Sequence, residues 1–100
     1  MIVRIFDTAV DPRNIELGKQ LFRDQVAPAF SGFSGCHGIE MLIAVEEGSG
    51  GYVDVTAISR WDSIEAIEGA TETPEYNEAL KDLRELFEKT PIVTHYEPVG

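Results

Sequence analysis

The sequence predicts an α+β domain, and three observations favour this class. Short segments in which apolar residues alternate with polar ones indicate strands, whereas two longer segments with an apolar repeat of three to four residues indicate helices. These segments follow one another in the order β-α-β-β-α-β. The chain has 100 residues, of which 43% are apolar, enough for one modest core. We therefore expect a single domain over residues 1–100.

The chain is expected to begin with a strand and a helix. Residues 2–6 (IVRIF) are rich in β-branched and aromatic side chains, which is typical of a strand. After a turn at residues 11–12, apolar positions recur every three or four residues up to about Ala27, and Pro28 is expected to end this helix. Residues 30–38 carry three glycines and two serines, and they are expected to form an ordered loop.

Two further strands are expected to form a hairpin in the middle of the chain. Residues 39–46 and residues 52–61 both show a period of two in their apolar positions. The segment between them, residues 48–51, reads Gly-Ser-Gly-Gly and is typical of a hairpin turn. It is not a phosphate-binding loop, because no helix follows it.

A broken helix and a last strand complete the predicted fold. Asp62 and Glu65 have the spacing of a capping box at the start of a short helix. Residues 73–75, Thr-Pro-Glu, are typical of a second helix start, which Pro91 ends, and residues 92–96 form a strand. This order predicts the ferredoxin-like split βαβ arrangement, an antiparallel sheet with both helices on one face.

The composition excludes several classes of partner. Eight Lys and Arg against eighteen Asp and Glu give a net charge of −10, so we expect no nucleic acid and no anionic membrane as a partner. The longest apolar run, residues 41–45, is far too short to span a bilayer, and the first residues do not resemble a signal peptide. The single Cys36 can form no internal disulfide, which favours a cytoplasmic location.

The parity of each strand assigns its residues to the covered or the open face of the sheet. On the third strand we expect the residues that face the helices to be Val53, Val55, Ala57, Ser59 and Trp61. On the first strand we expect Val3, Ile5 and Asp7 to face the helices. The open face would then carry Ile2, Arg4, Phe6, Asp54, Ile58 and Arg60. Because an apolar patch rimmed by polar groups is typical of an interface, we predict a two-fold homodimer through this face.

Two stretches of the sequence resemble the antibiotic biosynthesis monooxygenase family. They are Ser59-Arg60-Trp61-Asp62-Ser63-Ile64-Glu65-Ala66 and Thr73-Pro74-Glu75-Tyr76. Members of that family similarly place an Arg or Val and a Trp at the end of the third strand, followed by a short helix and a Ser/Thr-Pro-x-aromatic helix start. The element order and the length match along nearly the whole chain. The resemblance implies a dimeric α+β barrel with a pocket in each subunit, and cofactor-free oxygenation of phenolic or quinol-type substrates.

A pocket between the helices and the sheet would hold a small aromatic molecule. The expected substrate-binding residues are Phe22, Phe30, Phe33, Trp61 and Leu80. Trp61 would stack on the substrate and donate its indole N–H, or it is instead an anchor of the core at the strand end.

Three side chains are candidates for proton transfer at this pocket, and each has a structural alternative. Asp7 would act as a general base on a phenol, or it forms the turn after the first strand. His37 would shuttle protons at the pocket mouth, or it is a structural histidine. Tyr76 would orient a substrate oxygen or relay a proton, or it is the first apolar position of the last helix. Parity leaves the face of His95 undetermined.

No metal or cofactor is expected. The adjacent Cys36 and His37 cannot assemble a metal site, and no further Cys or spaced His pair completes one. The haem-degrading branch of the family uses an Asn, a Trp and a His where this sequence has Asp7, Ala70 and Leu80, so haem degradation is not expected. The alternative to an enzyme is a non-catalytic protein of the same fold that binds a small ligand or is associated with stress.

Overall fold

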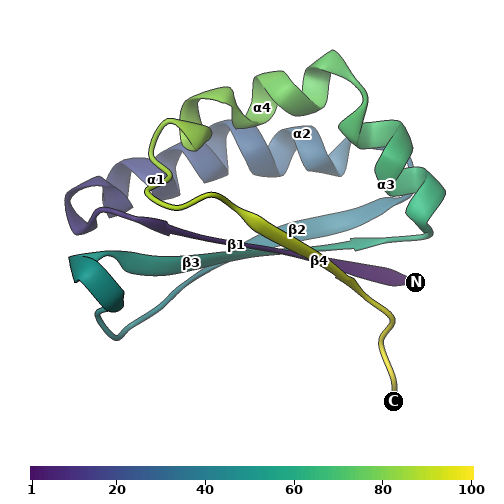
Figure 1. Ribbon diagram of the computed structural model, residues 1–100. Helices are drawn as coiled ribbons and strands as arrows, with labels where there is room; N and C mark the ends of the chain where they lie inside the picture. The colour runs from purple at the N-terminus through teal and green to yellow at the C-terminus, as the bar shows by residue number, and fades with distance from the viewer.

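The computed structural model describes residues 1–100, and the side chains of all of them except Ser49. Four antiparallel strands lie in the order β2-β3-β1-β4, with the bounds Ile2–Val10 (β1), Cys36–Ile43 (β2), Val53–Trp61 (β3) and Ile92–Tyr96 (β4). All the long helices lie over one face of this sheet, and the C-terminal tail leaves on the other side (Figure 1). The predicted ferredoxin-like α+β fold is confirmed.

The first helical segment runs further than the sequence indicated. A 3-10 turn, η1 (Pro12–Asn14), leads into α1 (Ile15–Leu21), the π-helical turn η2 (Phe22–Val26) and α2 (Ala27–Ser31). The expectation that Pro28 ends the helix is wrong. In the π turn the N–H of Ala27 bonds to the carbonyl of Phe22, five residues back, and Pro28 then falls in the first turn of α2, where its missing N–H is tolerated.

Side-chain caps start the two later helices, α3 (Ile64–Thr71) and α4 (Pro74–Arg84). The cap of α3 is Ser63, whose Oγ accepts from the N–H of Ala66 at 3.1 Å, so the predicted capping role of Asp62 is wrong. Thr73 caps α4 as expected, because its Oγ1 accepts from the N–H of Tyr76. This bond places Tyr76 in the first turn of α4, on the side of the helix that is buried.

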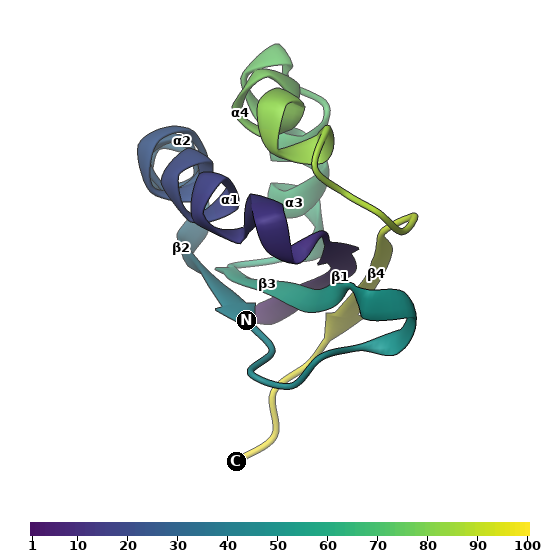
Figure 2. The ribbon, with the colours of Figure 1, turned by 90° about the vertical axis from the view of Figure 1, so that its left-hand side faces the viewer.

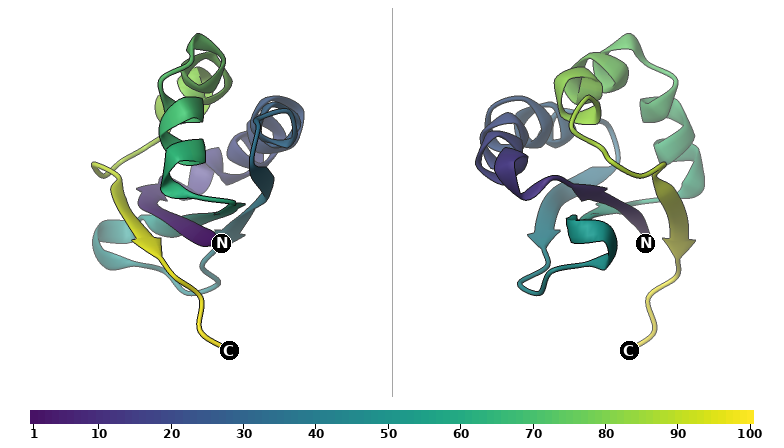
Figure 3. Two further views of the ribbon diagram at one scale, coloured as in Figure 1. Left: turned by 90° about the vertical axis from the view of Figure 1, so that its right-hand side faces the viewer. Right: turned by 60° about the vertical axis from the view of Figure 1, so that its left-hand side comes forward.

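The end of α4 and the β2–β3 hairpin also differ from the predicted bounds. The helix ends at Arg84, because the next residues turn toward β1, where the N–H of Glu88 bonds to the carbonyl of Ala9 at 2.8 Å. The hairpin turn contains a short 3-10 segment, η3 (Ser49–Gly51). Figures 2 and 3 show the two layers that result, with α1, α2, α3 and α4 above the sheet and the hairpin turn at one end of it.

The faces of β1 are the reverse of the prediction. Arg4 stands opposite Ser59 and Phe6 stands opposite Ala57, and residues directly opposite each other in an antiparallel pair share a face. Ser59 is buried beneath the helices, so the even-numbered residues of β1 also face the helices. The residues of β1 on the open face are therefore Val3, Ile5 and Asp7.

The expected faces of β3 are confirmed, since Val55, Ser59 and Trp61 are buried beneath the helices. β1 was assigned wrongly because residues 2–6 are apolar on both faces, so alternation alone does not tell which face is covered. The core packs around Trp61, which is 0% exposed, with Val26, Phe30, Ile67, Tyr76, Leu80 and Leu83. Over the described residues, no helix has the length and apolar character needed to cross a membrane.

Candidate functional site

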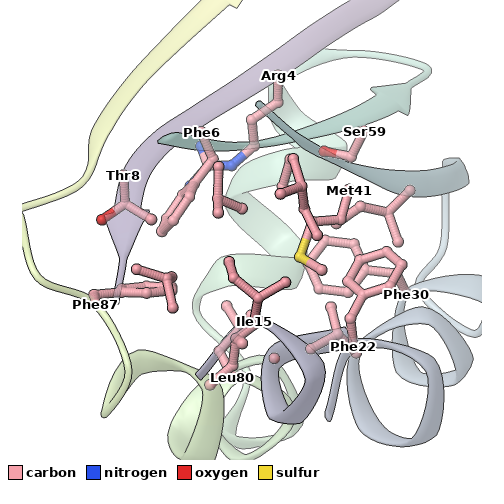
Figure 4. A pocket seen from close by; sticks show the side chains of 18 of the residues that line it. Arg4, Phe6, Thr8, Ile15, Phe22, Phe30, Met41, Ser59, Leu80 and Phe87 are labelled. Atoms are coloured by element: carbon pink, nitrogen blue, oxygen red, sulfur yellow. The ribbon is translucent and has the colours of Figure 1, made fainter. Parts of the chain in front are cut away.

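An apolar cavity lies between the sheet and the helices. Its volume is about 50 Å³, which is room for a few water molecules. Figure 4 shows Phe6 and Thr8 projecting from β1, Ile15 and Phe22 reaching toward them from the first helical segment, and Met41 between the two layers. The other apolar side chains that line it include Val26, Phe30, Ile39, Val55, Leu80 and Leu83. Such walls favour a ligand with an apolar ring.

Arg4 and Tyr76 line this cavity, and His95, an exposed residue outside the wall, contacts Arg4 from β4. The Nη2 of Arg4 donates to the hydroxyl oxygen of Tyr76 at 3.3 Å, and the Nη1 of Arg4 lies 2.7 Å from the Nε2 of His95. A guanidinium can only donate, so Nε2 accepts, and His95 is neutral with its proton on Nδ1. Partial desolvation, and then the charge of Arg4, lower the pKa of His95, which favours this neutral form.

The other polar side chains in the cavity wall are bonded within the protein. The Oγ1 of Thr8 donates to the carbonyl of Lys89 at 2.7 Å. The Oγ of Ser59 accepts from the indole Nε1 of Trp61 at 2.8 Å. By contrast, Arg4 has further N–H donors, and no acceptor for the hydroxyl proton of Tyr76 is found among the described residues. Arg4, Tyr76 and the hydroxyl proton of Ser59 thus keep hydrogen-bonding capacity for a ligand, and Arg4 is the charged group among them.

Four of the predicted site residues line the cavity, namely Phe22, Phe30, Tyr76 and Leu80. Trp61 and Phe33 do not line it but pack behind it, with ring centroids 6.4 Å apart in a stacked arrangement. The indole N–H of Trp61 is already bonded to Ser59, so the structure favours the core-anchor interpretation of Trp61.

The other two predicted residues lie outside the cavity. The placement of Asp7 on the helix side was wrong, because the register of β1 puts its carboxylate on the open face, where it accepts from the hydroxyl of Thr56 at 2.6 Å. His37 is exposed near the start of β2, and its Nε2 lies 2.5 Å from a carboxylate oxygen of Asp62. Neither residue is close enough to the cavity to belong to its wall.

Arg4 and His95 were not predicted as site residues. Arg4 was assigned to the open face, and the face of His95 was left undetermined. The sequence does contain a signal for Arg4. If the first strand is extended to Val10, just before the turn at residues 11–12, then every second residue back from Val10 shares its face, and this series includes Phe6 and Arg4. His95 then follows from the register, because it stands opposite Arg4 in the β1–β4 pair.

No group of three or more His, Cys, Asp or Glu that could hold a metal ion occurs in the described part of the chain. Cys36 is a free thiol, and burial raises its pKa, which disfavours the thiolate that a metal would need. The polar chemistry of the cavity wall therefore comes from the guanidinium of Arg4, the phenol of Tyr76 and the hydroxyls of Thr8 and Ser59.

Comparisons with solved structures identify the same fold elsewhere. No family model matches the sequence, and no curated protein matches it. A structure named antibiotic biosynthesis monooxygenase superposes with a TM-score of 0.74 at 16% identity and covers 100% of both chains. SnoaB from Streptomyces nogalater, a cofactor-independent oxygenase, gives 0.72 at 17% identity and covers 99% of this chain and 93% of its own. Rv0793 from Mycobacterium tuberculosis gives 0.72 at 18% identity, with 99% and 95% covered. The predicted resemblance is thus confirmed at the level of the fold.

Proposed function

We propose that this protein is a cofactor-independent monooxygenase that acts on a small phenolic or quinol-type aromatic molecule. The observation that carries the proposal is an apolar cavity with the Tyr76 phenol at its one polar end. The likeness in fold to SnoaB, a cofactor-independent oxygenase, supports it. Phe22, Phe30 and Leu80 would hold the ring, and the Tyr76 hydroxyl would hydrogen-bond a substrate oxygen.

The proposed reaction needs no cofactor because the substrate itself supplies the electrons. An ionised quinol is electron-rich and reduces dioxygen directly. One oxygen atom replaces a ring hydrogen, and the other leaves as water, so a quinol and one O₂ give a hydroxyquinone and one H₂O. The contribution of the protein would be to hold the ring, to exclude bulk water and to stabilise charge on the substrate oxygen.

The cavity must widen before it can hold a ring. A closed cavity that takes a benzene-sized ligand has a volume of roughly 150 Å³, about three times the volume found here. Met41 lies between the sheet and the helices (Figure 4), and an unbranched thioether side chain adapts readily to a new neighbour. We expect the substrate to enter by displacing this side chain rather than by moving the backbone.

We also propose that two copies associate through the open face of the sheet, in the cytoplasm. On this face Leu42, Ile92 and Tyr96 are 48%, 67% and 51% exposed. They surround Ile5 and Ile58, which stand opposite each other in the β1–β3 pair. Apolar side chains spread over a whole sheet face are typical of an interface, and the two-fold pairing of such faces would close a barrel.

Oxygen consumption tests the proposed reaction. The protein is incubated with a panel of hydroquinones, naphthols and anthrones while dissolved oxygen is recorded. We expect uptake above the uncatalysed rate with at least one class. Tyr76→Phe should lower kcat/KM by about 100-fold, the low end of what one hydrogen-bond donor to a developing oxyanion contributes. Tyr52→Phe, which removes the same hydroxyl at the hairpin end, is the matched control and should retain full activity. Ring binding without any uptake would instead identify a non-catalytic binding protein.

A further inference from the structure

Arg4 is a partly buried cation whose bonded partners are both neutral. Its guanidinium donates to the Tyr76 hydroxyl and to the His95 imidazole, and no ion pair joins it to a carboxylate among the residues that the structure describes. Arg13 and Arg60, in contrast, pair with Asp11 and Glu40. Four of the eight basic residues lack an ion pair among the described residues, and Arg4 is the one of them that lines the cavity.

The groups around Arg4 do not compensate its charge. Ser59 faces it from β3, His95 from β4 and Tyr76 from α4, and all three are uncharged when His95 is neutral. A second cation lies beyond Tyr76, because the guanidinium of Arg84 sits 5.9 Å from the centre of the Tyr76 ring. This end of the cavity is therefore electropositive, whereas the rest of its wall is apolar.

The guanidinium of Arg4 would be stabilised most by an anionic ligand whose apolar part fills the cavity. Coulomb attraction between opposite charges strengthens as water is excluded, and a charged hydrogen bond is about twice as strong as a neutral one. The ligand must combine an apolar ring with a single anionic oxygen, since Arg4 is the one charged side chain among the described residues that line the cavity.

We propose that Arg4 binds the ionised oxygen of the aromatic substrate, so that the cavity takes phenolates in preference to neutral phenols. His95 acts as a positioning residue: its Nε2 holds one arm of the guanidinium at 2.7 Å, while Tyr76 meets another. On binding, the phenol O–H bond breaks, the electron pair stays on the oxygen beside Arg4, and the proton passes to the solvent. The inference rests on the proposed function for the class of ring, and it adds the residue that binds the ionised oxygen and the resulting preference for phenolates.

The preference is measured with a coloured phenol that undergoes no oxygenation during the experiment. 4-Nitrophenol is titrated with the protein under nitrogen across a range of pH, and the absorbance of its phenolate reports the ionisation of the bound ligand. We expect the phenolate to bind about tenfold more tightly than the phenol, which lowers the pKa of the bound ligand by about one unit. 4-Nitroanisole, which cannot ionise, measures the affinity of the cavity for the ring alone.

Variants separate the roles of the two residues. Arg4→Met should abolish the preference for phenolate while 4-nitroanisole binds as before, and the exposed Arg23→Met is the matched control that should keep the preference. His95→Gln retains an acceptor and should keep most of the preference, whereas His95→Leu should weaken it several-fold. The two His95 variants also carry the test if Arg4→Met does not fold.

The possible failures of the two proposals are distinguishable. Equal binding of phenol and phenolate, a preference that survives Arg4→Met, or no binding of either ligand would overturn the role of Arg4. Phenolate preference without oxygen uptake on any substrate would leave that role intact and refute the oxygenase. Uptake that Arg4→Met leaves unchanged would refute the role of Arg4 and support the oxygenase.

Discussion

The guanidinium of Arg4 and the imidazole of His95 lie 2.7 Å apart, although 91 positions separate them in the sequence. The register of β1 and β4 joins them, because the two residues stand directly opposite each other in this antiparallel pair. The pair holds a cation of the cavity wall against a ring that lies outside the wall, and its geometry requires that His95 carry no charge.

The titration of His95 should report this contact. Its pKa lies below the ordinary 6.5, first because of burial and second because of Arg4, so Arg4→Met should raise the His95 pKa part of the way back. Since the folded-state pKa is lowered, the contribution of His95 to stability is present above about 6.5 and is lost as the pH falls through the lower, folded-state value. Ring signals of both histidines, followed by NMR in the two proteins, would show this; a His95 curve that Arg4→Met does not move contradicts the contact.

Trp61 and Ser59 should be coupled in stability. Trp61→Phe removes both buried volume and the indole N–H bond, and Ser59→Ala leaves that N–H buried without an acceptor, so each should lower the free energy of unfolding by about 1–3 kcal/mol. The double variant should cost less than the sum of the two, because the same hydrogen bond is lost in both. Urea unfolding gives all four values, and strict additivity would mean that the hydrogen bond contributes nothing.

The open face of the sheet should determine the oligomeric state. Sedimentation velocity at micromolar concentration is expected to give a dimer for the wild-type protein. Leu42→Glu places a charge on the open face and should give a monomer, since an unpaired charge in an interface is costly. Val45→Glu makes the same chemical change at a side chain that is 95% exposed just beyond β2, and it should remain dimeric. A monomeric wild-type protein rules the interface out.

Two glycines should respond in opposite ways to replacement by alanine. In α1 a Cβ at Gly18 would meet only the Cδ1 atoms of Leu83 and Leu86, both at 3.8 Å, which is ordinary contact. Gly18→Ala should therefore stabilise the fold by about 0.5–1 kcal/mol through helix propensity. Gly35 has φ +79° and its Cβ would lie 2.7 Å from the Cβ of Ala66, so Gly35→Ala should destabilise by about 1–3 kcal/mol. Urea denaturation gives the midpoint of each variant. If both variants shift the midpoint in the same direction relative to the wild-type protein, the packing around one of the two glycines differs from that described here.

Much of the fold could be predicted because its signals are local. The period of two in residues 52–61 correctly identified the covered face of β3, and the cap at Thr73 correctly started α4. Residues 92–96 form the last strand with the predicted bounds. The limits of the first helix were missed because a π turn has no strong sequence signature, and it shifted the backbone bonds just before Pro28.

The sequence predicted the apolar side of the candidate site and its Tyr76, but not Arg4. Phe22 and Leu80 lie on helical segments whose buried faces repeat every three to four residues, and their place in the cavity wall follows from that repeat. Phe30 was expected in a loop, and the structure places it in α2 instead. Asp7 was misplaced because β1 is apolar on both faces, which leaves its orientation to the strands beside it. The same error hid Arg4, since a cation in a mixed strand is normally expected on the solvent side.

The order of elements, the antiparallel α+β class and the apolar stripes of the helices are all encoded locally, within a few residues of each position, and so the sequence suffices for them. The meeting of Arg4, Tyr76 and His95 is of another kind, because it depends on the pairing of β1 with β4 and on how α4 packs over both. Strand register is a relationship between distant segments, and shifting it by one residue would move Arg4 to the other face. The presence of the Arg4 guanidinium in the cavity wall is therefore determined by the tertiary structure.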